Sequence, residues 1–385
     1  MSTIRIGILG LGTVGQAVVQ LNRPFAGHDF AFSRALVRNP GRPRTVDVPL
    51  TVDAAEILND PDIDIVVEAA GGIEPPRHWI RQALENGKAV VTANKELIAY
   101  HGRELLDVSQ TVQSYLGFEA SVAGGIPVLD AVQYHLSAAP IDTVYGVVNG
   151  TTNYLLTAMM NGQPFEQALT EAQKAGFAEA DPSADIRGWD AVRKLVILSA
   201  LSFGVWTDPD QVLVEGLESW PPALFERLAS CGWTLRLMAL AQRISDGTVQ
   251  AQVRPTAVPL DHPLGRLTGP QNGVGFLGQA GSFWLEGPGA GGVATATSVW
   301  ADIRRSVTRR SIGVSFPLGQ RENVVEAVPL PILAIAQDPD RRIDSARPLN
   351  ASGSVGMMDA AEAIDGVWVF PAFGGPAARQ IQGGA

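Results

Sequence analysis

Apolar and polar positions along the first third of the chain follow a repeated strand-then-helix pattern. Residues 4–9 have the composition of a short buried strand, and residues 16–21 have helical composition. Further strands are predicted at 30–37, 64–68 and 88–92, and further helices at 74–86 and 95–110. Repeated βα units are typical of a doubly wound parallel sheet, so we expect an α/β fold.

Glycines mark the junction between the first strand and the first helix. In a G-x-G-x-x-G pattern the first glycine permits a tight turn, the second lets a pyrophosphate approach the backbone, and the third lets helix and strand pack closely. The free N–H groups at the start of the helix favour an anion. The junction therefore predicts a Rossmann nucleotide-binding domain. Its cofactor contacts are expected at Gly10, Gly12, Thr13, Val14 and Gly15.

The end of the second strand bears on which dinucleotide is bound. A carboxylate here binds the ribose 2′-hydroxyl of NAD, whereas arginine accommodates the 2′-phosphate of NADP. Residues 37–44 contain no carboxylate but include Arg38, Arg42 and Arg44. Because guanidinium groups bind phosphate well, the segment favours NADP over NAD. A solvated basic loop, or an enzyme that accepts both cofactors, is the alternative.

Composition and charge narrow the class of protein. The 385 residues suffice for two domains, and 46% hydrophobic with 18% charged residues is ordinary for a globular enzyme. A formal net charge of -10 argues against a nucleic-acid partner, because phosphate binding needs a basic face. Cys231 is the only cysteine, so no intrachain disulfide can form. With no signal-like start and no apolar run of about 20 residues, we expect a cytoplasmic protein with no membrane partner.

One charged stretch, residues 178–194, holds the candidate chemistry. It contains four carboxylates and three cations and runs directly into an apolar helix. Asp190 and Lys194 are four residues apart, so on a helix they share a face. Lysine is scarce in this chain and, unlike arginine, can give up its proton. The stretch indicates a site that holds a small zwitterion and offers it a proton; a capped surface helix with an ordinary ion pair is the alternative.

Six sequence phrases together carry a family resemblance. They are GLGTVG at 10–15, TANK at 92–95, FEASVAGGIP at 118–127, NGTTNY at 149–154, the charged stretch at 179–194 and GPGAGG at 287–292. In this order and spacing they resemble homoserine dehydrogenase, over residues 1 to about 310. The resemblance implies a homodimer that interconverts L-aspartate 4-semialdehyde and L-homoserine with a nicotinamide cofactor. That step lies on the route to threonine, methionine and isoleucine.

The resemblance also implies roles for single residues. Reduction of an aldehyde needs a hydride on carbon and a proton on oxygen, and a cation near that oxygen stabilises the developing charge. Lys194 matches the family's proton donor and Lys95 a lysine between nicotinamide and substrate, although either could take the acid–base role. Asp190 would hold the Lys194 ammonium or meet the substrate. Substrate would further contact Glu179, Asp185, Gly150 and Thr151, and the cofactor would further contact Thr92, Lys95 and Gly291.

The segment 118–127 implies a sodium ion in the same way. Family members hold this ion through main-chain carbonyls and one carboxylate, matched here by Glu119, Val122, Gly124 and Ile126. Oxygen ligands suit such an ion, although the spacing alone does not indicate it. A strand end followed by a glycine-rich turn explains the same residues.

The expected domains follow from these assignments. The nucleotide-binding domain is predicted over 1–130, completed by a returning helix near 293–310. A substrate-binding and dimerisation domain of α+β type is predicted over 131–292. The tail, 311–385, shows no pattern of a regulatory ACT domain. It has strand candidates at 331–336 and 367–373 and a helix candidate at 358–364.

Phe177 departs from the family pattern and keeps one alternative open. Many family members have tyrosine there, so a hydroxyl that could touch the substrate is missing. A related dehydrogenase acting on another amino-acid aldehyde is therefore one alternative. A catalytically silent, NADP-binding regulatory protein is the other, because a fold alone does not establish function.

Overall fold

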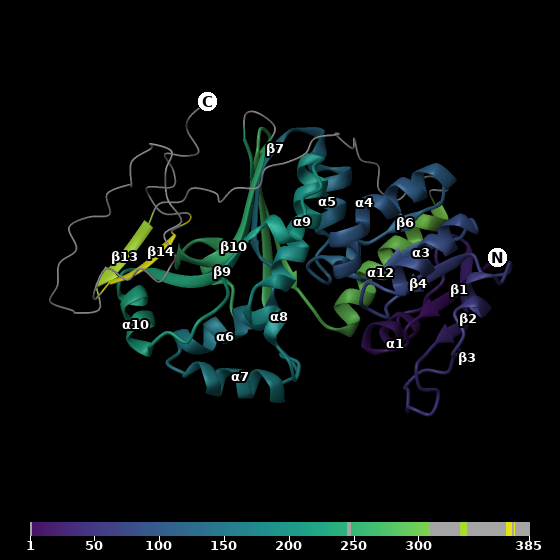
Figure 1. Cartoon of the computed structure of the whole chain (residues 1–385), viewed down its shortest axis with the longest axis horizontal. Coiled ribbons are helices and arrows are strands. Elements are labelled where there is room, and N and C mark those ends of the chain that lie inside the picture. Colours follow the sequence, from purple (N-terminus) through teal and green to yellow (C-terminus); the bar gives the residue numbers. More distant parts are fainter. Residues whose placement is uncertain (1, 245–247, 309–331, 337–366, 372, 374–385) are drawn as a thin grey trace. The chain divides into compact units, whose positions relative to one another are not determined.

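The computed structural model describes residues 2–244, 248–308, 332–336, 367–371 and 373 (Figure 1). The chain divides into two compact units, whose described residues fall within the following ranges. Unit 1 takes in 1–144, 193–211 and 276–323, and unit 2 takes in 145–192, 212–275 and 324–385. The domain boundaries expected near 130 and 292 stay a prediction.

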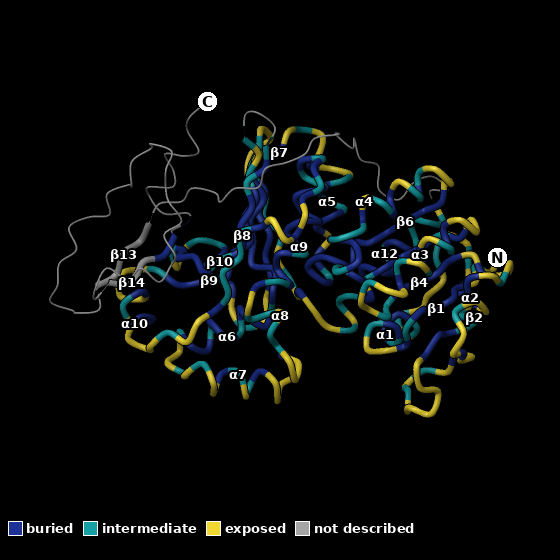
Figure 2. Tube along the Cα trace, viewed as in Figure 1, coloured by how far each residue is buried: buried dark blue, intermediate teal, exposed yellow. Residues whose placement is uncertain are grey.

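A parallel sheet of six strands forms the centre of unit 1. Its order is β3-β2-β1-β4-β5-β6, and each neighbouring pair runs parallel. The strands are β1 Ser2–Leu9, β2 His28–Leu36, β3 Leu50–Thr51, β4 Ile65–Glu68, β5 Ala89–Thr92 and β6 Leu116–Gly117. Strand β4 is buried along its whole length, as expected for a strand covered on both faces (Figure 2). This strand order confirms the predicted doubly wound sheet.

Helices follow the strands of unit 1 as the sequence pattern predicts. They are α1 Thr13–Gln20, α2 Ala55–Leu58, α3 Pro76–Glu85, α4 Lys95–Val112, α5 Val128–Tyr134 and α12 Gly292–Thr308, with short 3-10 turns η1 Glu119–Ser121, η2 Leu136–Ala138 and η3 Pro209–Gln211. The pattern missed β3, α2 and β6, because two to four residues give no measurable periodicity. Helix α3 has proline in its first turn, where a missing N–H does no harm.

Helix α12 packs against α1 and the nucleotide-binding sheet, although Trp300 of α12 and Val18 of α1 are 282 residues apart along the chain. The indole N–H of Trp300 donates to the carbonyl of Val18 at 2.8 Å, and its ring meets the edge of Phe30 at 5.0 Å between centroids. Trp300 is 4% exposed and therefore belongs to the core of unit 1. A buried tryptophan of this kind stabilises a core by about 3–5 kcal/mol relative to alanine.

A second sheet of six strands has the order β12-β11-β7-β9-β10-β8. Its strands are β7 Ile141–Val147, β8 Leu213–Val214, β9 Trp233–Arg243, β10 Val249–Pro259, β11 Gln271–Gly278 and β12 Gly281–Pro288. Strands β9 and β10 pair antiparallel, whereas β8 runs parallel to β10, so the sheet is mixed. The accompanying helices are α6 Gly150–Met160, α7 Phe165–Lys174, α8 Ser183–Ile186, α9 Trp189–Phe203, α10 Pro222–Ser230 and α11 Pro263–Arg266.

The described part of the tail is a two-stranded sheet of unit 2. Strand β13 Ile332–Ala336 pairs antiparallel with β14 Val367–Pro371, which confirms the two predicted strands where they are described. The helix predicted at 358–364 lies outside the described residues. Within the described part of the chain, no helix combines the length and apolar character needed to cross a membrane.

Candidate active site

The glycine turn of unit 1 has the geometry that the sequence predicts. Gly10 has a φ of 104°, and a Cβ there would lie 2.7 Å from the backbone of Ala69 and Ala70. A Cβ on Gly15 would lie 2.3 Å from the carbonyl oxygen of Gly10. Gly12 faces open space and, as the N-cap of α1, provides no side-chain hydrogen bond. The first N–H groups of α1 are therefore accessible to a phosphate.

The glycine-rich phrase before α12 lies against this turn. A Cβ on Gly292 would lie 3.1 Å from Cγ2 and 3.2 Å from the carbonyl oxygen of Thr13. Its neighbour Gly291 is exposed, with a φ of 113°. Unit 1 thus brings together predicted cofactor residues, Thr13 and Gly291, that are far apart in the sequence.

The three arginines after β2 differ in the hydrogen bonds that their guanidinium groups make. Arg44 donates to the carbonyl oxygens of Arg42 at 2.7 Å, Asn39 at 2.9 Å and Pro40 at 3.3 Å, so its guanidinium holds the loop. Arg38 and Arg42 are exposed, and neither guanidinium has a hydrogen-bond or ion-pair partner among the described residues. Two cations are therefore accessible to an anion at this loop. The sequence alone did not separate these roles.

Lys95 is the first residue of α4 and directly follows the N-cap residue Asn94. The side-chain oxygen of Asn94 accepts from the N–H of Leu97 at 3.1 Å, and the side-chain amide of Asn94 donates to Gly72 at 2.7 Å. Thr92, at the end of β5, is fully buried, and its hydroxyl donates to Glu68 at 2.5 Å. The Thr92 hydroxyl is therefore engaged inside unit 1, and Lys95 is half-buried just beyond it.

An ion pair within unit 1 joins the helices that carry the two lysines. Arg193 and Glu96 form this pair at 2.7 Å. Glu96 directly follows Lys95 at the start of α4, and Arg193 directly precedes Lys194 on α9. Lys194 is 7% exposed, which is rare for lysine and points to a functional or paired role. The fold thus brings together two lysine-bearing segments that are about 100 residues apart.

A second cluster lies in unit 2 and contains a residue that the sequence interpretation missed. The side-chain amide of Asn149 donates to Asp185 and to Asp190, each at 2.7 Å. Its side-chain oxygen accepts from the N–H of Thr152 and so caps α6. Asn149 and Asp190 are both buried, at 4% exposure each. An asparagine directly before a helix is a recognisable N-cap signal, but the sequence pattern predicted no helix at 150–160, so this signal was missed.

The other predicted substrate residues of unit 2 have distinct surroundings. A Cβ on Gly150 would lie 2.8 Å from the carbonyl of Pro270, so packing requires glycine. The hydroxyl of Thr151 donates to the carbonyl of Phe177 at 2.7 Å. The Phe177 ring is 40% exposed and lies 5.0 Å from that of Tyr154. Glu179 is exposed, and its carboxylate has no partner among the described residues.

The segment with the implied sodium ligands is buried in unit 1. Both carboxylate oxygens of Glu119 accept backbone N–H groups, from Leu129 at 3.1 Å and Asp130 at 2.8 Å. Burial, followed by the neighbouring Asp130, raises the pKa of Glu119 well above its ordinary value. The carbonyl of Val122 accepts no hydrogen bond from a described residue. Backbone carbonyl and carboxylate oxygens are the type of ligand that a hard cation takes, so the donor atoms of this segment fit such an ion in their chemistry.

The implied ligands Gly124 and Ile126 already have partners. The Gly124 carbonyl accepts from the Ser298 hydroxyl at 2.6 Å, and the Ile126 carbonyl accepts from the N–H of Val128 at 2.8 Å. Each carbonyl oxygen has a second lone pair, so these bonds do not exclude an ion.

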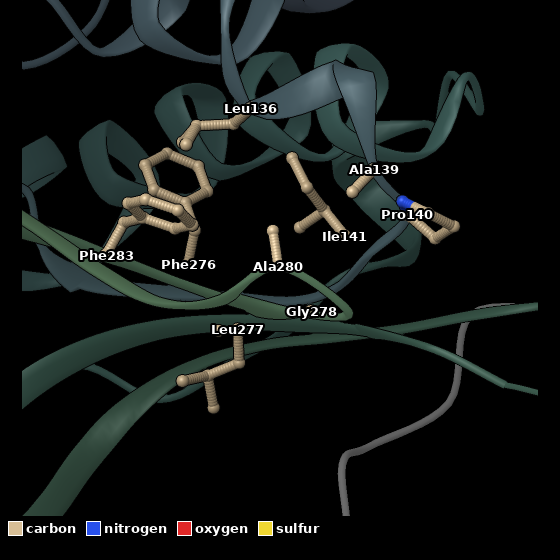
Figure 3. Close-up of a pocket in the computed structure, with 10 residues that line it drawn as sticks. Leu136, Ala139, Pro140, Ile141, Phe276, Leu277, Gly278, Ala280 and Phe283 are labelled. Atoms are coloured by element: carbon tan, nitrogen blue, oxygen red, sulfur yellow. The ribbon is translucent and has the colours of Figure 1, made fainter.

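An apolar pocket of about 190 Å³ in unit 1 contributes no chemistry to the site (Figure 3). Its lining includes no titratable side chain and none of the predicted site residues. The residues around it are Leu136, Ala139, Pro140, Ile141, Phe276, Leu277, Gly278, Ala280, Gly281 and Phe283. Among the described residues, no cluster of His, Cys, Asp and Glu has metal-binding geometry.

The Rossmann sheet, the glycine turn and a buried lysine one helical turn after a buried aspartate define the class as a dinucleotide-dependent oxidoreductase. Comparison with known proteins specifies it further. The family model for homoserine dehydrogenase matches residues 127–303, and the model for the homoserine dehydrogenase NAD-binding domain matches residues 10–119. The chain belongs to the homoserine dehydrogenase family, as its sequence phrases indicated.

Individual relatives agree with this assignment. A homoserine dehydrogenase of Bacillus subtilis (strain 168) is 40% identical over 328 residues, which covers 82% of this chain and 75% of the relative. A solved homoserine dehydrogenase from Thiobacillus denitrificans has a TM-score of 0.79 at 34% identity and covers 88% of this chain and 84% of that one. A hyperthermophilic archaeal homoserine dehydrogenase in complex with NADPH has a TM-score of 0.68 at 27% identity and covers 80% of this chain and 98% of that one.

Proposed function

We propose that this chain catalyses the reversible, NAD(P)-dependent interconversion of L-aspartate 4-semialdehyde and L-homoserine. The observation that supports it best is the buried Lys194, one helical turn after the buried Asp190 on α9. A bound nicotinamide supplies or accepts the hydride. The chain's own residues bind the amino acid, orient its carbonyl and move a proton at its oxygen.

Lys194 is the proposed proton donor, and Lys95 the proposed orienting cation. Burial disfavours a charged lysine, whereas a neighbouring carboxylate favours it, so Asp190 would set the readiness of Lys194 to give up its proton. Positive charge near the carbonyl oxygen also stabilises the negative charge that develops as hydride reaches carbon. The ion pair between Glu96 and Arg193 supports these two roles, because it links the residue after Lys95 to the residue before Lys194 within unit 1.

Recognition of the substrate's amino group is assigned to the acidic residues of unit 2. Glu179 has an unpartnered, exposed carboxylate, and Asp185 is oriented by the side-chain amide of Asn149. An ammonium group needs such anions when it leaves water. Gly150 and Thr151 would shape the same surface, Thr151 by holding the carbonyl of Phe177.

NADP is the proposed preferred cofactor. Its 2′-phosphate would lie against Arg38 and Arg42, whose guanidinium groups have no partner among the described residues, while Arg44 keeps the loop in shape. NAD remains the second choice, since it needs only the glycine turn. We further propose that a sodium ion binds at Glu119, Val122, Gly124 and Ile126, and that the protein is a homodimer located in the cytoplasm.

The test is an absorbance assay at the nicotinamide band with L-homoserine, run separately with NADP and NAD. We expect turnover with both and higher kcat/KM with NADP. Turnover with neither, combined with retained NADPH binding, would establish the silent regulatory alternative. A preference for a different amino-acid aldehyde in the reverse direction would establish the altered-substrate alternative.

Lys194→Ala tests the proton donor. General acid catalysis contributes about 10²- to 10⁴-fold, so kcat should fall by that factor while the Kd for NADPH stays unchanged. Lys174→Ala is the matched control, because Lys174 is an exposed lysine at the end of α7. An undiminished kcat in Lys194→Ala would transfer the role to Lys95.

A further inference from the structure

Glu68 is a buried acid at the centre of the cofactor-binding edge. It is the last residue of β4 and is fully buried. The sheet register places it beside Leu9, which precedes the glycine turn, and beside Thr92, which precedes the Lys95 segment. Ligands of doubly wound sheets bind at this carboxyl edge, at the point where strand order reverses.

The Glu68 carboxylate accepts hydrogen bonds from two segments, the loop after β4 and the end of β5. Oε1 accepts the backbone N–H groups of Ala70 at 2.8 Å and Gly71 at 3.1 Å, which holds the loop after β4. Oε2 accepts the Thr92 hydroxyl at 2.5 Å, which holds the end of β5. Burial raises the pKa of Glu68, while these hydrogen bonds act in the opposite direction.

The loop that Glu68 holds touches both parts of the site in unit 1. The peptide between Ala69 and Ala70 packs so tightly on Gly10 that a Cβ there would lie 2.7 Å away. At the other end of the loop, the Gly72 carbonyl accepts from the side-chain amide of Asn94 at 2.7 Å. Asn94 caps α4 directly before Lys95, and its own N–H donates to the Thr92 hydroxyl at 3.0 Å.

The outer side of this loop is open. Gly71 and Gly72 are exposed, have φ angles of 74° and 79°, and a Cβ on either would meet nothing within 4 Å. Positive φ angles at two successive residues need glycine and a firm anchor to persist. The carboxylate of Glu68 is that anchor, since it binds the first N–H groups of the loop.

We infer that Glu68 is a positioning residue of the proposed reaction, which sets the loop 69–72 against the nicotinamide half of the cofactor and sets Lys95 toward the substrate. Glu68 itself contacts neither substrate nor cofactor. It acts through the Ala70 and Gly71 amides on one side and through Thr92 and Asn94 on the other. The inference rests on the proposed function and adds to it a residue that no sequence phrase singled out.

Three variants separate the two sets of hydrogen bonds that Glu68 accepts, from the Ala70 and Gly71 amides and from the Thr92 hydroxyl. Glu68→Ala removes both, so the Kd for NADPH should rise about tenfold and kcat should fall about 10²-fold, as expected for a misplacement near 1 Å. Glu68→Gln keeps one carbonyl oxygen for the Ala70 and Gly71 amides and should restore the Kd to within about threefold of the wild type. Thr92→Val removes only the bond to the Thr92 hydroxyl, so kcat should fall, and kcat is the readout for this variant because Thr92 is itself an expected cofactor contact.

Ser109→Ala is the matched control. The Ser109 hydroxyl is buried at the opposite end of α4 and donates to the carbonyl of Ser114 at 2.6 Å. This variant loses one buried hydrogen bond in the same unit and should lower the melting temperature without changing Kd or kcat. If Ser109→Ala reproduces the kinetic changes of Glu68→Ala, general destabilisation explains them and the inference is wrong.

Other outcomes are equally decisive. Wild-type Kd and kcat in Glu68→Ala would overturn the inference, and if that variant does not fold, an unchanged kcat in Thr92→Val would do so. NADPH binding is measured by nicotinamide fluorescence without substrate. If the wild type turns over no amino-acid aldehyde, the proposed function fails, whereas the Kd comparison still decides whether Glu68 positions the loop.

Discussion

At the residue scale, Asn149 orders charges that would otherwise repel one another. One neutral amide donates to Asp185 and Asp190 at 2.7 Å each and caps α6 through its oxygen. A lysine there would neutralise the proposed site for the substrate's ammonium group, whereas a carboxamide donates to both acids without adding a charge. Asn149 therefore prepares an anionic surface without neutralising it.

Asn149→Ala should weaken substrate binding more than cofactor binding. The change removes the hydrogen bond that Asn149 donates to each of two carboxylates, and it removes a cap that stabilises a helix by about 1 kcal/mol. We expect KM for L-homoserine to rise about tenfold with the Kd for NADPH unchanged, measured by steady-state kinetics and fluorescence. Asp53→Ala is the control, because it removes a similar bond, to the N–H of Ala55 at the start of α2. An unaltered KM in Asn149→Ala would assign the residue a structural role only.

At the scale of elements, the tail strand β14 is fastened to unit 2 by aromatic side chains. The N–H of Phe373 donates to the carbonyl of Ala257 in β10 at 2.9 Å. The centroid of the Phe373 ring lies 4.7 Å from that of Tyr145 and 5.8 Å from that of His262. The ring centroids of Phe370 and Trp220 are 5.9 Å apart. Phe370 and Phe373 are buried, so these two residues are part of the core of unit 2.

Phe373→Ala should destabilise unit 2. Truncation of a buried phenylalanine costs about 3–5 kcal/mol, so the urea midpoint should fall, whereas Phe373→Leu should lose less because most of the apolar volume remains. Burial lowers the pKa of His262, and water admitted by the alanine variant should raise it toward its ordinary value. NMR titration of His262 and urea unfolding measure the two effects. Identical behaviour of the Ala and Leu variants would show that the ring contributes no packing.

At the scale of the whole molecule, buried carboxylates make stability depend on pH. Asp302 on α12 accepts hydrogen bonds from Tyr115 at 2.9 Å, from the N–H of Glu119 at 2.8 Å and from Arg305 at 2.9 Å. Burial raises the pKa of Asp302 from 3.8 to about 6, although Arg305 acts in the opposite direction. The folded state therefore binds the Asp302 proton more tightly than the unfolded state does. The contribution of Asp302 to the free energy of unfolding is greatest below pH 3.8 and is lost as the pH rises through about 6.

Asp302→Asn should flatten that dependence. Asparagine does not titrate, so the difference in unfolding free energy between variant and wild type should shift in favour of the variant as pH rises from 4 to about 6. Urea unfolding at several pH values in this window measures the shift. The charge of Asp302 is one of the causes that raise the pKa of nearby Glu119, so the measured shift reports the loss of Asp302 together with its effect on Glu119. Parallel pH profiles would contradict the assignment to Asp302.

The sequence by itself determined the fold class, the family and most of the residues assigned to the site. These rest on local information: the strand of residues 4–9, the glycines at 10, 12 and 15, and residues that follow strands or open helices. Steric limits on a tight turn and the start of a helix act over a few residues, so they can be read without neighbours. The two tail strands were also predicted from local information, namely the composition of residues 331–336 and 367–373.

Only the tertiary structure decided how side chains share partners across the chain. It separated Arg44, which holds its loop, from Arg38 and Arg42, which face solvent. It also revealed Asn149 between two acids and Glu68 between two strand ends. Hydrogen bonds between residues 24 to 41 positions apart depend on strand register and helix packing, which local sequence patterns do not specify.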